Sequence, residues 1–417
     1  MNETLPLPGF GPEPEAMEFT PNRAAGLARL QVFTPRTART YTSQRNYDFG
    51  PDKRANVSCL SPWIRHRLIS EEEVLRAVLA RHNPSSAEKF IQEVFWRGYF
   101  KGWMEQRPSV WQAYRAGVDV VLEDAERDGA LRADLNAAMA GETGIDGFDA
   151  WAKELVATGY LHNHARMWFA SIWIFTLRLP WELGADFFLR HLMDGDPASN
   201  TLGWRWVAGL HTKGKTYAAR ASNINKYTAG RFNPLHQLSN QTDALIEDED
   251  HPRIPLDLES SMPNAPYLLI LSEEDTTPEQ VLSTPPAAIL ALDATSGRSP
   301  LEIGTAATGF AQGALSDAVA RSTANFGIEG HLAQGDWAHA ITEAAEKAGV
   351  THVVTPYTPI GPAAEAISAA KPNLEAAGLT LTQIRRDYDT LTWPHATRGF
   401  FGLKKKIPGI LTGLGLK

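Results

Sequence analysis

The sequence predicts two domains, an all-α domain followed by an α/β domain with a parallel sheet. Residues 1–245 carry 28 Lys and Arg, 27 Asp and Glu and ten of the twelve tryptophans, whereas residues 246–417 carry 12 and 21. Hydrophobic periodicity changes at the same place, from a helical pattern to short apolar runs. Of the 417 residues, 43% are apolar and 21% are charged, as in an ordinary globular protein. The two halves are therefore interpreted as separate folding units.

The first half predicts helices almost throughout. Residues 1–18 are rich in proline and acidic side chains and are expected to be disordered. A helical domain is expected over residues 19–239, and its clearest helix covers 85–103, where Ser85 and Glu88 form a capping-box signature. Further helices are expected at 146–157, 161–177 and 183–193. No period-2 pattern occurs in this half, so it is predicted to be all-α.

The second half alternates strands with helices. An acidic, proline-punctuated linker is expected at 240–265, followed by an α/β domain at 266–403. Buried parallel strands are predicted at 267–271, 287–293 and 351–356, and helices at 310–322, 337–348 and 362–377. Residues 404–417 are expected to be a basic, glycine-rich tail at a solvated edge.

Composition excludes several classes of protein. A single cysteine, Cys59, cannot form an internal disulfide, a cysteine-ligated zinc site or an iron–sulfur cluster. The longest apolar stretch, 167–177, is too short to span a bilayer. The acidic N-terminus does not resemble a secretory or transit peptide, so a cytoplasmic protein without a membrane or metal partner is expected. Asp194 and Asp196 lack the further acids of a calcium loop.

Two constellations in the helical half could bind a ligand. Ser58 and Ser61 precede a predicted helix start, where amide groups can bind phosphate, although the same pattern is typical of a helix cap. Glu93, Trp96, Arg97 and Phe100 share one helical face, which suits a planar ligand or an aromatic core stripe with an ion pair.

Six ordered segments resemble the DNA photolyase/cryptochrome family. They are YTSQRN at 41–46, SCLSPW at 58–63, QEVFWRGYF at 92–100, TGIDGFD at 143–149, TGYLHNHARM at 158–167 and HLMDGDPASNTLGWRW at 191–206. The resemblance implies an all-α domain that binds FAD, with any second, antenna chromophore unknown. That family places its α/β, Rossmann-like domain first, so the order here predicts a circular permutation. SEEDTTPEQ at 272–280 replaces a usually arginine-rich segment, which leaves an unrelated α/β module as the alternative.

The resemblance also implies roles for individual residues. Tyr41, Ser58, Ser61, Arg166, Asp194, Asp196 and Asn200 match positions that hold the flavin. The lesion pocket is matched by Glu93, Trp96, Arg97, Asn163 and Met167, and contacts to DNA are expected from Trp96, Arg97, Asn163, His164, Lys213 and Lys215. Related enzymes that repair (6-4) photoproducts carry a histidine where Asn163 and Met167 stand, which disfavours that substrate.

Electron transfer to the flavin is expected through Trp204 and then Trp181. The family's outermost tryptophan has no counterpart near Asp128, and Trp103, Trp111 or Trp151 are alternatives. The function implied is blue-light-driven repair of cyclobutane pyrimidine dimers in DNA, a carbon–carbon lyase reaction. The alternatives are a cryptochrome-like photoreceptor that signals to a protein partner, and a flavin-free protein that only kept the fold. The oligomeric state is left open, with a monomer favoured.

Overall fold

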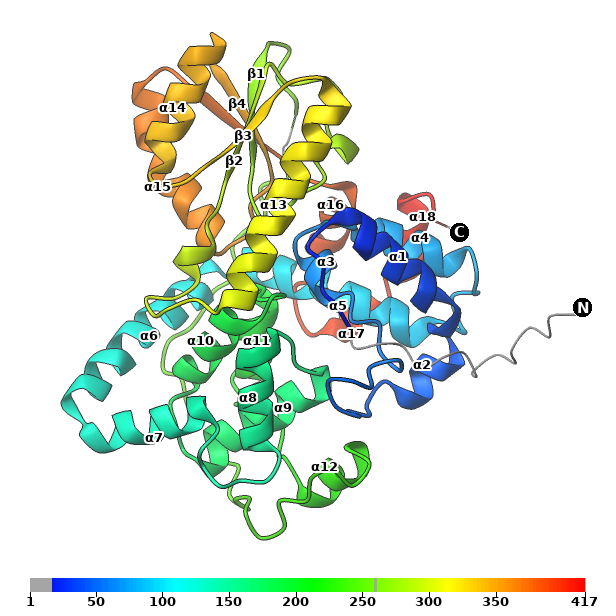
Figure 1. Ribbon diagram of the computed structural model, residues 1–417, viewed down its shortest axis with the longest axis vertical. Coiled ribbons are helices and arrows are strands. Elements are labelled where there is room, and N and C mark those ends of the chain that lie inside the picture. The colour runs from blue at the N-terminus through cyan, green and yellow to red at the C-terminus, as the bar shows by residue number, and fades with distance from the viewer. Residues whose placement is uncertain (1–16, 259–260, 417) are drawn as a thin grey trace, which may run out of the picture.

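The computed structural model describes residues 17–258 and 261–416, so most of the expected N-terminal disorder lies outside the described residues. Figure 1 shows a helical body and, above it, a sheet flanked by helices. The helical body comprises α1 (Arg23–Phe33), α2 (Arg39–Gln44), α3 (Ser61–Arg65), α4 (Glu71–Leu79), α5 (Glu88–Glu105), α6 (Pro108–Arg127), α7 (Gly129–Ala140), α8 (Phe148–Thr158), α9 (Asn163–Ser171), the π-helical turn Ile172–Thr176, α10 (Trp181–His191), α11 (Pro197–Val207) and α12 (Ala221–Tyr227). The prediction of an all-α first half is confirmed.

The capping box predicted for the helix at 85–103 is wrong. Helix α5 begins at Glu88 after Ala87, which provides no side-chain cap, and the Ser85 hydroxyl donates to Asn83 Oδ1 at 2.9 Å. Asn83 organises a turn here and uses the serine locally, as short polar side chains often do before a helix. The capping box of this region belongs to α4, where Ser70 and Glu73 satisfy each other's backbone amides.

The second half contains a five-stranded parallel sheet in the order β3-β2-β1-β4-β5. Its strands are β1 (Tyr267–Leu271), β2 (Ala288–Leu292), β3 (Gly330–Ala333), β4 (His352–Pro356) and β5 (Thr380–Ile384). The three predicted strands are confirmed as β1, β2 and β4. Sequence analysis did not predict β3, because this short, half-exposed edge strand, GHLA, lacks a buried apolar run.

Helices cover both faces of the sheet (Figure 1). Helix α13 (Thr305–Phe326) packs with Leu269 and Leu271 of β1, whereas α14 (Trp337–Ala348) and α15 (Pro362–Ala376) pack with Leu268 and Ile270. Successive residues of a strand point to opposite faces, so β1 is buried on both sides. This explains the uninterrupted apolar run YLLIL.

The chain then returns to the helical body, which corrects the expected tail at 404–417. Helices α16 (Asp387–Thr392), α17 (Phe400–Lys404) and α18 (Ile407–Gly413) follow β5. Ile407, Ile410 and Leu411 are buried in the same hydrophobic cluster as residues of α4 and α5. Their i, i+3, i+4 spacing forms an apolar helical face, which outweighs the three preceding lysines.

Residues 240–258, within the expected linker, contain no helix or strand but lie against the helical body. Backbone amides of Leu245 and Ile254 donate to Ala208 and Gln106, at 3.0 and 2.9 Å. Arg205 holds Glu247 through two bonds of 2.5 Å. Within the part of the chain described, none of the helices combines the length and apolar composition of a bilayer span.

Buried ion pairs join the two halves directly after β1. Arg65 of α3 donates to both carboxylate oxygens of Glu274, at 2.7 and 2.5 Å, and Arg67 lies 3.3 Å from Asp275. Within the second half, Arg386 donates to both oxygens of Asp275, at 2.6 and 2.7 Å. Arg67 pairs with Asp389 at 2.7 Å. The acidic segment SEED at 272–275 therefore anchors the sheet to the helical body and places α3 for the site described below.

Candidate functional site

The candidate site centres on the loop between α10 and α11, which α3 holds in place. Arg65 Nε donates to the carbonyl of Gly195 at 3.0 Å, and His66 Nε2 lies 3.1 Å from that of Met193. Two predicted flavin ligands, Asp194 and Asp196, are buried in this loop. Half-buried Ser61, the first residue of α3, is thereby brought beside them.

Asp194 is a buried carboxylate with spare hydrogen-bonding capacity. Its Oδ2 accepts from Arg166 Nη2 at 2.9 Å, while Oδ1 is buried without a hydrogen-bond partner. Burial opposes ionisation, yet Arg166, helped by the Ser61 hydroxyl and by Arg97, outweighs it and keeps the pKa of Asp194 below its ordinary value. A buried acceptor without a donor is unusual in a native protein. The ring N–H and ribityl hydroxyls of FAD are donors of the kind this oxygen lacks, so the site fits that cofactor.

Asp196 is fully engaged in structure. It caps α11 by accepting from the Ser199 amide at 2.8 Å, and Lys101 and Arg65 lie 3.5 and 3.8 Å from Oδ2. Burial opposes its ionisation, but these cations hold its pKa well below the usual range. Asp196 thus fixes the start of α11, and any contact with a flavin comes in addition to that role.

Helix α11 carries Asn200 and, one turn later, Trp204. The Asn200 amide donates to the Ala185 carbonyl of α10 at 2.7 Å. Trp204 is buried and lies so close to Gly184 that a Cβ there would meet Trp204 Cη2 at 2.3 Å. Glycine at this position therefore lets the indole lie directly on α10.

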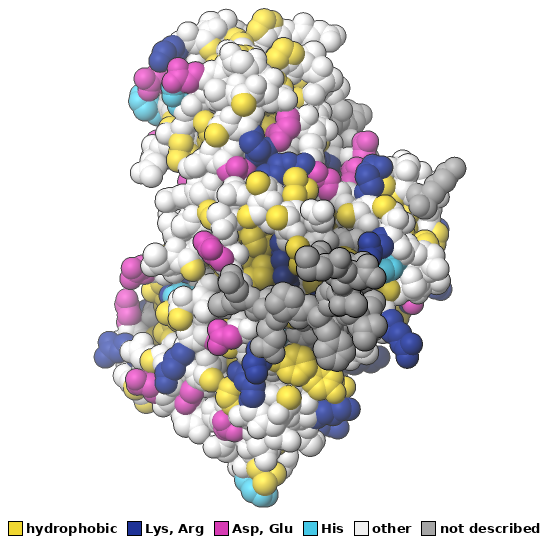
Figure 2. Space-filling model, turned by 45° about the vertical axis from the view of Figure 1, so that its right-hand side comes forward, with side chains coloured by type: hydrophobic (Ala, Val, Ile, Leu, Met, Phe, Trp, Pro, Cys, Tyr) yellow, Lys and Arg dark blue, Asp and Glu magenta, His cyan; other side chains and the backbone are white. Residues whose placement is uncertain are grey.

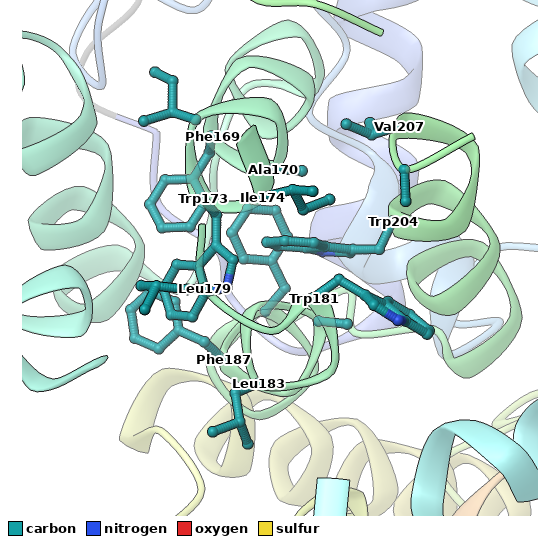
Figure 3. Packing of buried hydrophobic residues seen from close by; sticks show 14 of the residues in the cluster. Phe169, Ala170, Trp173, Ile174, Leu179, Trp181, Leu183, Phe187, Trp204 and Val207 are labelled. Atoms are coloured by element: carbon teal, nitrogen blue, oxygen red, sulfur yellow. The ribbon is translucent and has the colours of Figure 1, made fainter. Parts of the chain in front are cut away.

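Trp181 lies one turn before Gly184 on the same helix. Figure 3 shows Trp204 and Trp181 within one aromatic cluster that also contains Trp173. The ring of Trp204 meets that of Trp173 edge-on, at 6.2 Å between centroids. Trp181 is thus the first residue of α10, and Trp204 of α11 packs on the same helix one turn further along.

The remaining predicted flavin residues have structural contacts. The Tyr41 ring packs on Phe90 at 5.1 Å, and burial raises the pKa of its hydroxyl. Ser58 Oγ accepts weakly from the Leu60 amide at 3.4 Å. Cys59, which lies between Ser58 and Leu60 in the sequence, adopts φ 54°, a left-handed conformation that bends the chain into α3. Helix α3 has only five residues, so the phosphate site expected from SCLSPW stays a prediction.

Two predicted lesion-pocket residues already have partners within the protein. Glu93 forms an ion pair with Arg45, and the Trp96 ring stacks on Phe400 of α17, with centroids 3.9 Å apart and an interplanar angle of 11°. Sequence analysis missed both partners. Arg45 was within reach, since it belongs to YTSQRN, but Phe400 lies about 300 positions beyond Trp96 in the chain.

The other predicted pocket and DNA residues are more open. Asn163 is exposed at the start of α9, and Arg97 and Met167 are half-buried. His164 stacks on Trp168 at 4.1 Å, and its Nδ1 lies 2.9 Å from the Asn46 carbonyl. Lys215 is exposed, and exposed Lys213 lies 3.4 Å from Asp250.

Comparison with known proteins identifies the domain that carries this site. Residues 90–243 match the family described as the FAD binding domain of DNA photolyase. The deoxyribodipyrimidine photo-lyase of Synechococcus sp. is 30% identical over 218 residues, which are 50% of this chain and 43% of that protein. That of Streptomyces griseus is 34% identical over 170 residues (40% and 36%), and cryptochrome DASH of rice is 29% identical over 202 (47% and 34%).

Among solved structures, a class III photolyase from Agrobacterium tumefaciens is 27% identical, with a TM-score of 0.43 over 51% of this chain and 43% of that chain. The chain spans less than half the length of these curated relatives. Residues 90–243 are thus a flavin-binding domain, and its cofactor is FAD. Through residues 90–243 the chain is similar to proteins of the DNA photolyase/cryptochrome family. The circular permutation stays a prediction.

Proposed function

We propose that this protein is a blue-light-driven, FAD-dependent enzyme of the photolyase type that splits cyclobutane pyrimidine dimers in DNA. The observation that carries the proposal is the buried Oδ1 of Asp194, which has no hydrogen-bond partner. Asp194 is bound by Arg166 and lies in the loop that leads into α11, the helix that carries Trp204. When bound, FAD supplies the absorption of light and the electron that opens the cyclobutane ring. The similarity to curated photo-lyases supports this function. The cytoplasmic location stays a prediction.

The protein's own groups would hold the cofactor and keep its surroundings dry. Asp194 would accept from a donor of the cofactor and Arg166 would keep that carboxylate ionised. Trp204, which is buried one turn after Asn200 on α11, would exclude water from that side. A dry, preorganised polar site strengthens electrostatic stabilisation of a transient charge.

DNA would reach the site from the side of Asn163, Arg97 and Met167. A dimer must leave the duplex to be reached, and flipping costs a few kcal/mol, less for a damaged pair. Exposed Lys215 would contribute to phosphate contacts, and such contacts weaken as salt rises. The proposed partner is therefore DNA that contains pyrimidine dimers.

Two measurements test the proposal. Asp194→Ala should abolish the flavin absorbance of the purified protein, whereas Asp250→Ala, at an exposed carboxylate, should leave it unchanged. The reduced wild-type protein should remove thymine dimers from irradiated DNA under blue light and not in the dark. Full FAD occupancy in Asp194→Ala would mean that the site has been placed wrongly.

A second candidate is a photoreceptor that signals without repair. Phe400 covers one face of Trp96 and Arg45 engages Glu93, so two groups expected to receive the dimer are occupied. On the face in Figure 2, basic side chains of the helical half are dispersed among acidic and apolar ones. If the reduced protein leaves dimers intact and does not distinguish damaged from undamaged DNA, the photoreceptor function takes the place of repair.

A further inference from the structure

The aromatic residues beyond Trp181 form a continuous line along α6 that ends beside a carboxylate of the second half. Trp181 contacts Tyr114 of α6, with ring centroids 5.8 Å apart. Tyr114 in turn contacts Trp111, one turn earlier on α6, at 5.3 Å. The three rings belong to the main hydrophobic core of the helical body, and Tyr114 and Trp181 also line a cavity of about 580 Å³.

Trp111 ends at a carboxylate supplied by the other half of the chain. Its indole Nε1–H donates to Glu365 Oε1 at 2.6 Å. Glu365 lies in the first turn of α15 and is exposed, whereas the Trp111 ring is buried. A buried redox-active ring thus has one hydrogen bond, and that bond leads to a group in contact with solvent.

We propose that Tyr114 and Trp111 extend the electron path from Trp204 and Trp181, and that Glu365 accepts the proton of oxidised Trp111. This inference rests on the proposed flavin photochemistry. For each electron passed inward through Trp204, Trp181 and Tyr114, Trp111 loses one electron. The Nε1–H bond of Trp111 then breaks, its proton moves to Glu365 Oε1, and a neutral indolyl radical remains. An external thiol reductant returns one electron and one proton to the pair.

The local contacts explain why the path ends at Trp111 and not at Tyr114. An oxidised phenol must release its proton to hold the oxidised state, and the Tyr114 hydroxyl is buried without a hydrogen-bond partner. Burial, with nearby Asp186, also raises the pKa of Tyr114 well above its ordinary value. Tyr114 can pass charge on but has no acceptor for its proton.

Two arginines beside the aromatic line also favour loss of the proton from oxidised Trp111. The Arg205 guanidinium lies over Trp181 at 5.8 Å, and that of Arg115 over Trp111 at 5.7 Å. When either ring is oxidised and positively charged, the guanidinium beside it repels that charge. At Trp111 the Glu365 carboxylate relieves this repulsion by accepting the proton, because loss of the proton leaves the ring neutral.

Other tryptophans do not join this line. Trp103 contacts His211 at 4.7 Å, and Trp151 contacts Trp168 at 5.4 Å. Trp173 meets Trp204, but it is fully buried and its indole N–H donates to the carbonyl of Pro180 at 2.8 Å. A backbone carbonyl cannot accept a proton at neutral pH. Trp103→Phe is therefore a matched control for Trp111→Phe.

The experiment follows tryptophan radicals by transient absorption after a blue flash on FAD-loaded protein without reductant. Trp111→Phe should lose the long-lived neutral tryptophan radical, and Trp103→Phe should retain it. Glu365→Gln keeps a hydrogen-bond acceptor at an exposed position but cannot take the proton, so the radical should decay in its cationic form. Wild-type kinetics in both Trp111→Phe and Glu365→Gln would overturn the proposal, as would a wild-type protein that forms no tryptophan radical. Dimer removal by chemically reduced wild-type protein, measured separately, does not need this path and so reports on the proposed function alone.

Discussion

Replacing Glu274 by glutamine should weaken the contact between the two halves of the protein. Glu274 receives both terminal nitrogens of Arg65, and the two side chains are only 3% and 1% exposed. Glutamine removes the charge and points an amide N–H₂ at the guanidinium, which is left with Asp196 at 3.8 Å. Breaking a buried pair by removing one partner costs roughly 3–5 kcal/mol, and the remaining carboxylate places this case near the lower figure.

A loss of about 3 kcal/mol corresponds to roughly a hundredfold change in the unfolding equilibrium. Urea unfolding followed by tryptophan fluorescence measures it, since ten of the twelve tryptophans lie in the first half. Lys213→Gln, which removes an exposed pair with Asp250, should leave the midpoint unchanged. The double variant Arg65→Met/Glu274→Leu should recover much of the loss, because both charges of the pair are removed together while Lys101 and Asp196 keep each other at 3.5 Å. A loss below about 1 kcal/mol for Glu274→Gln would refute the role assigned to this pair.

Three further outcomes are expected. Burial, with Glu274 and Asp293 nearby, raises the pKa of Glu273 from 4.5 to about 7, so the stability that its protonated form supports is fully present below about pH 4.5 and is lost as the pH rises to about 7. In urea unfolding at pH 5.5 and 8, Glu273→Gln should lose less stability than wild type over that interval, and an equal loss would contradict the assignment. Phe400→Ala should uncover Trp96 and so tighten the binding of dimer-containing DNA, measured by fluorescence anisotropy. Phe401→Ala, at the neighbouring side chain that is 78% exposed, should leave the affinity unchanged. Equal affinities of Phe400→Ala and wild type would show that Trp96 is not a stacking surface. Trp204→Phe should keep FAD bound but suppress its photoreduction, and unchanged kinetics would point to a different donor.

Local chemistry explains which elements the sequence could predict. Strand β1 and helix α14 match their predictions closely, because an apolar run with no polar interruption and a helix ended by Gly349 are both local signals. Ser85 misled because its local competitor, Asn83, also forms turns. The edge strand β3 lacks such a signal, because backbone pairing with β2 stabilises it and its side chains form no buried apolar run.

The candidate site divides in the same way. The FAD-binding helical domain, the parallel sheet and the candidates Asp194, Asn200 and Trp204 could all be predicted, because ordered motifs and hydrophobic periodicity depend on neighbouring residues. The folded chain was needed to show which charges meet, such as Arg65 with Glu274, and which rings meet, such as Trp96 with Phe400. Those contacts join residues about 200 and 300 positions apart, where burial and ion pairing act through space and leave no pattern along the chain.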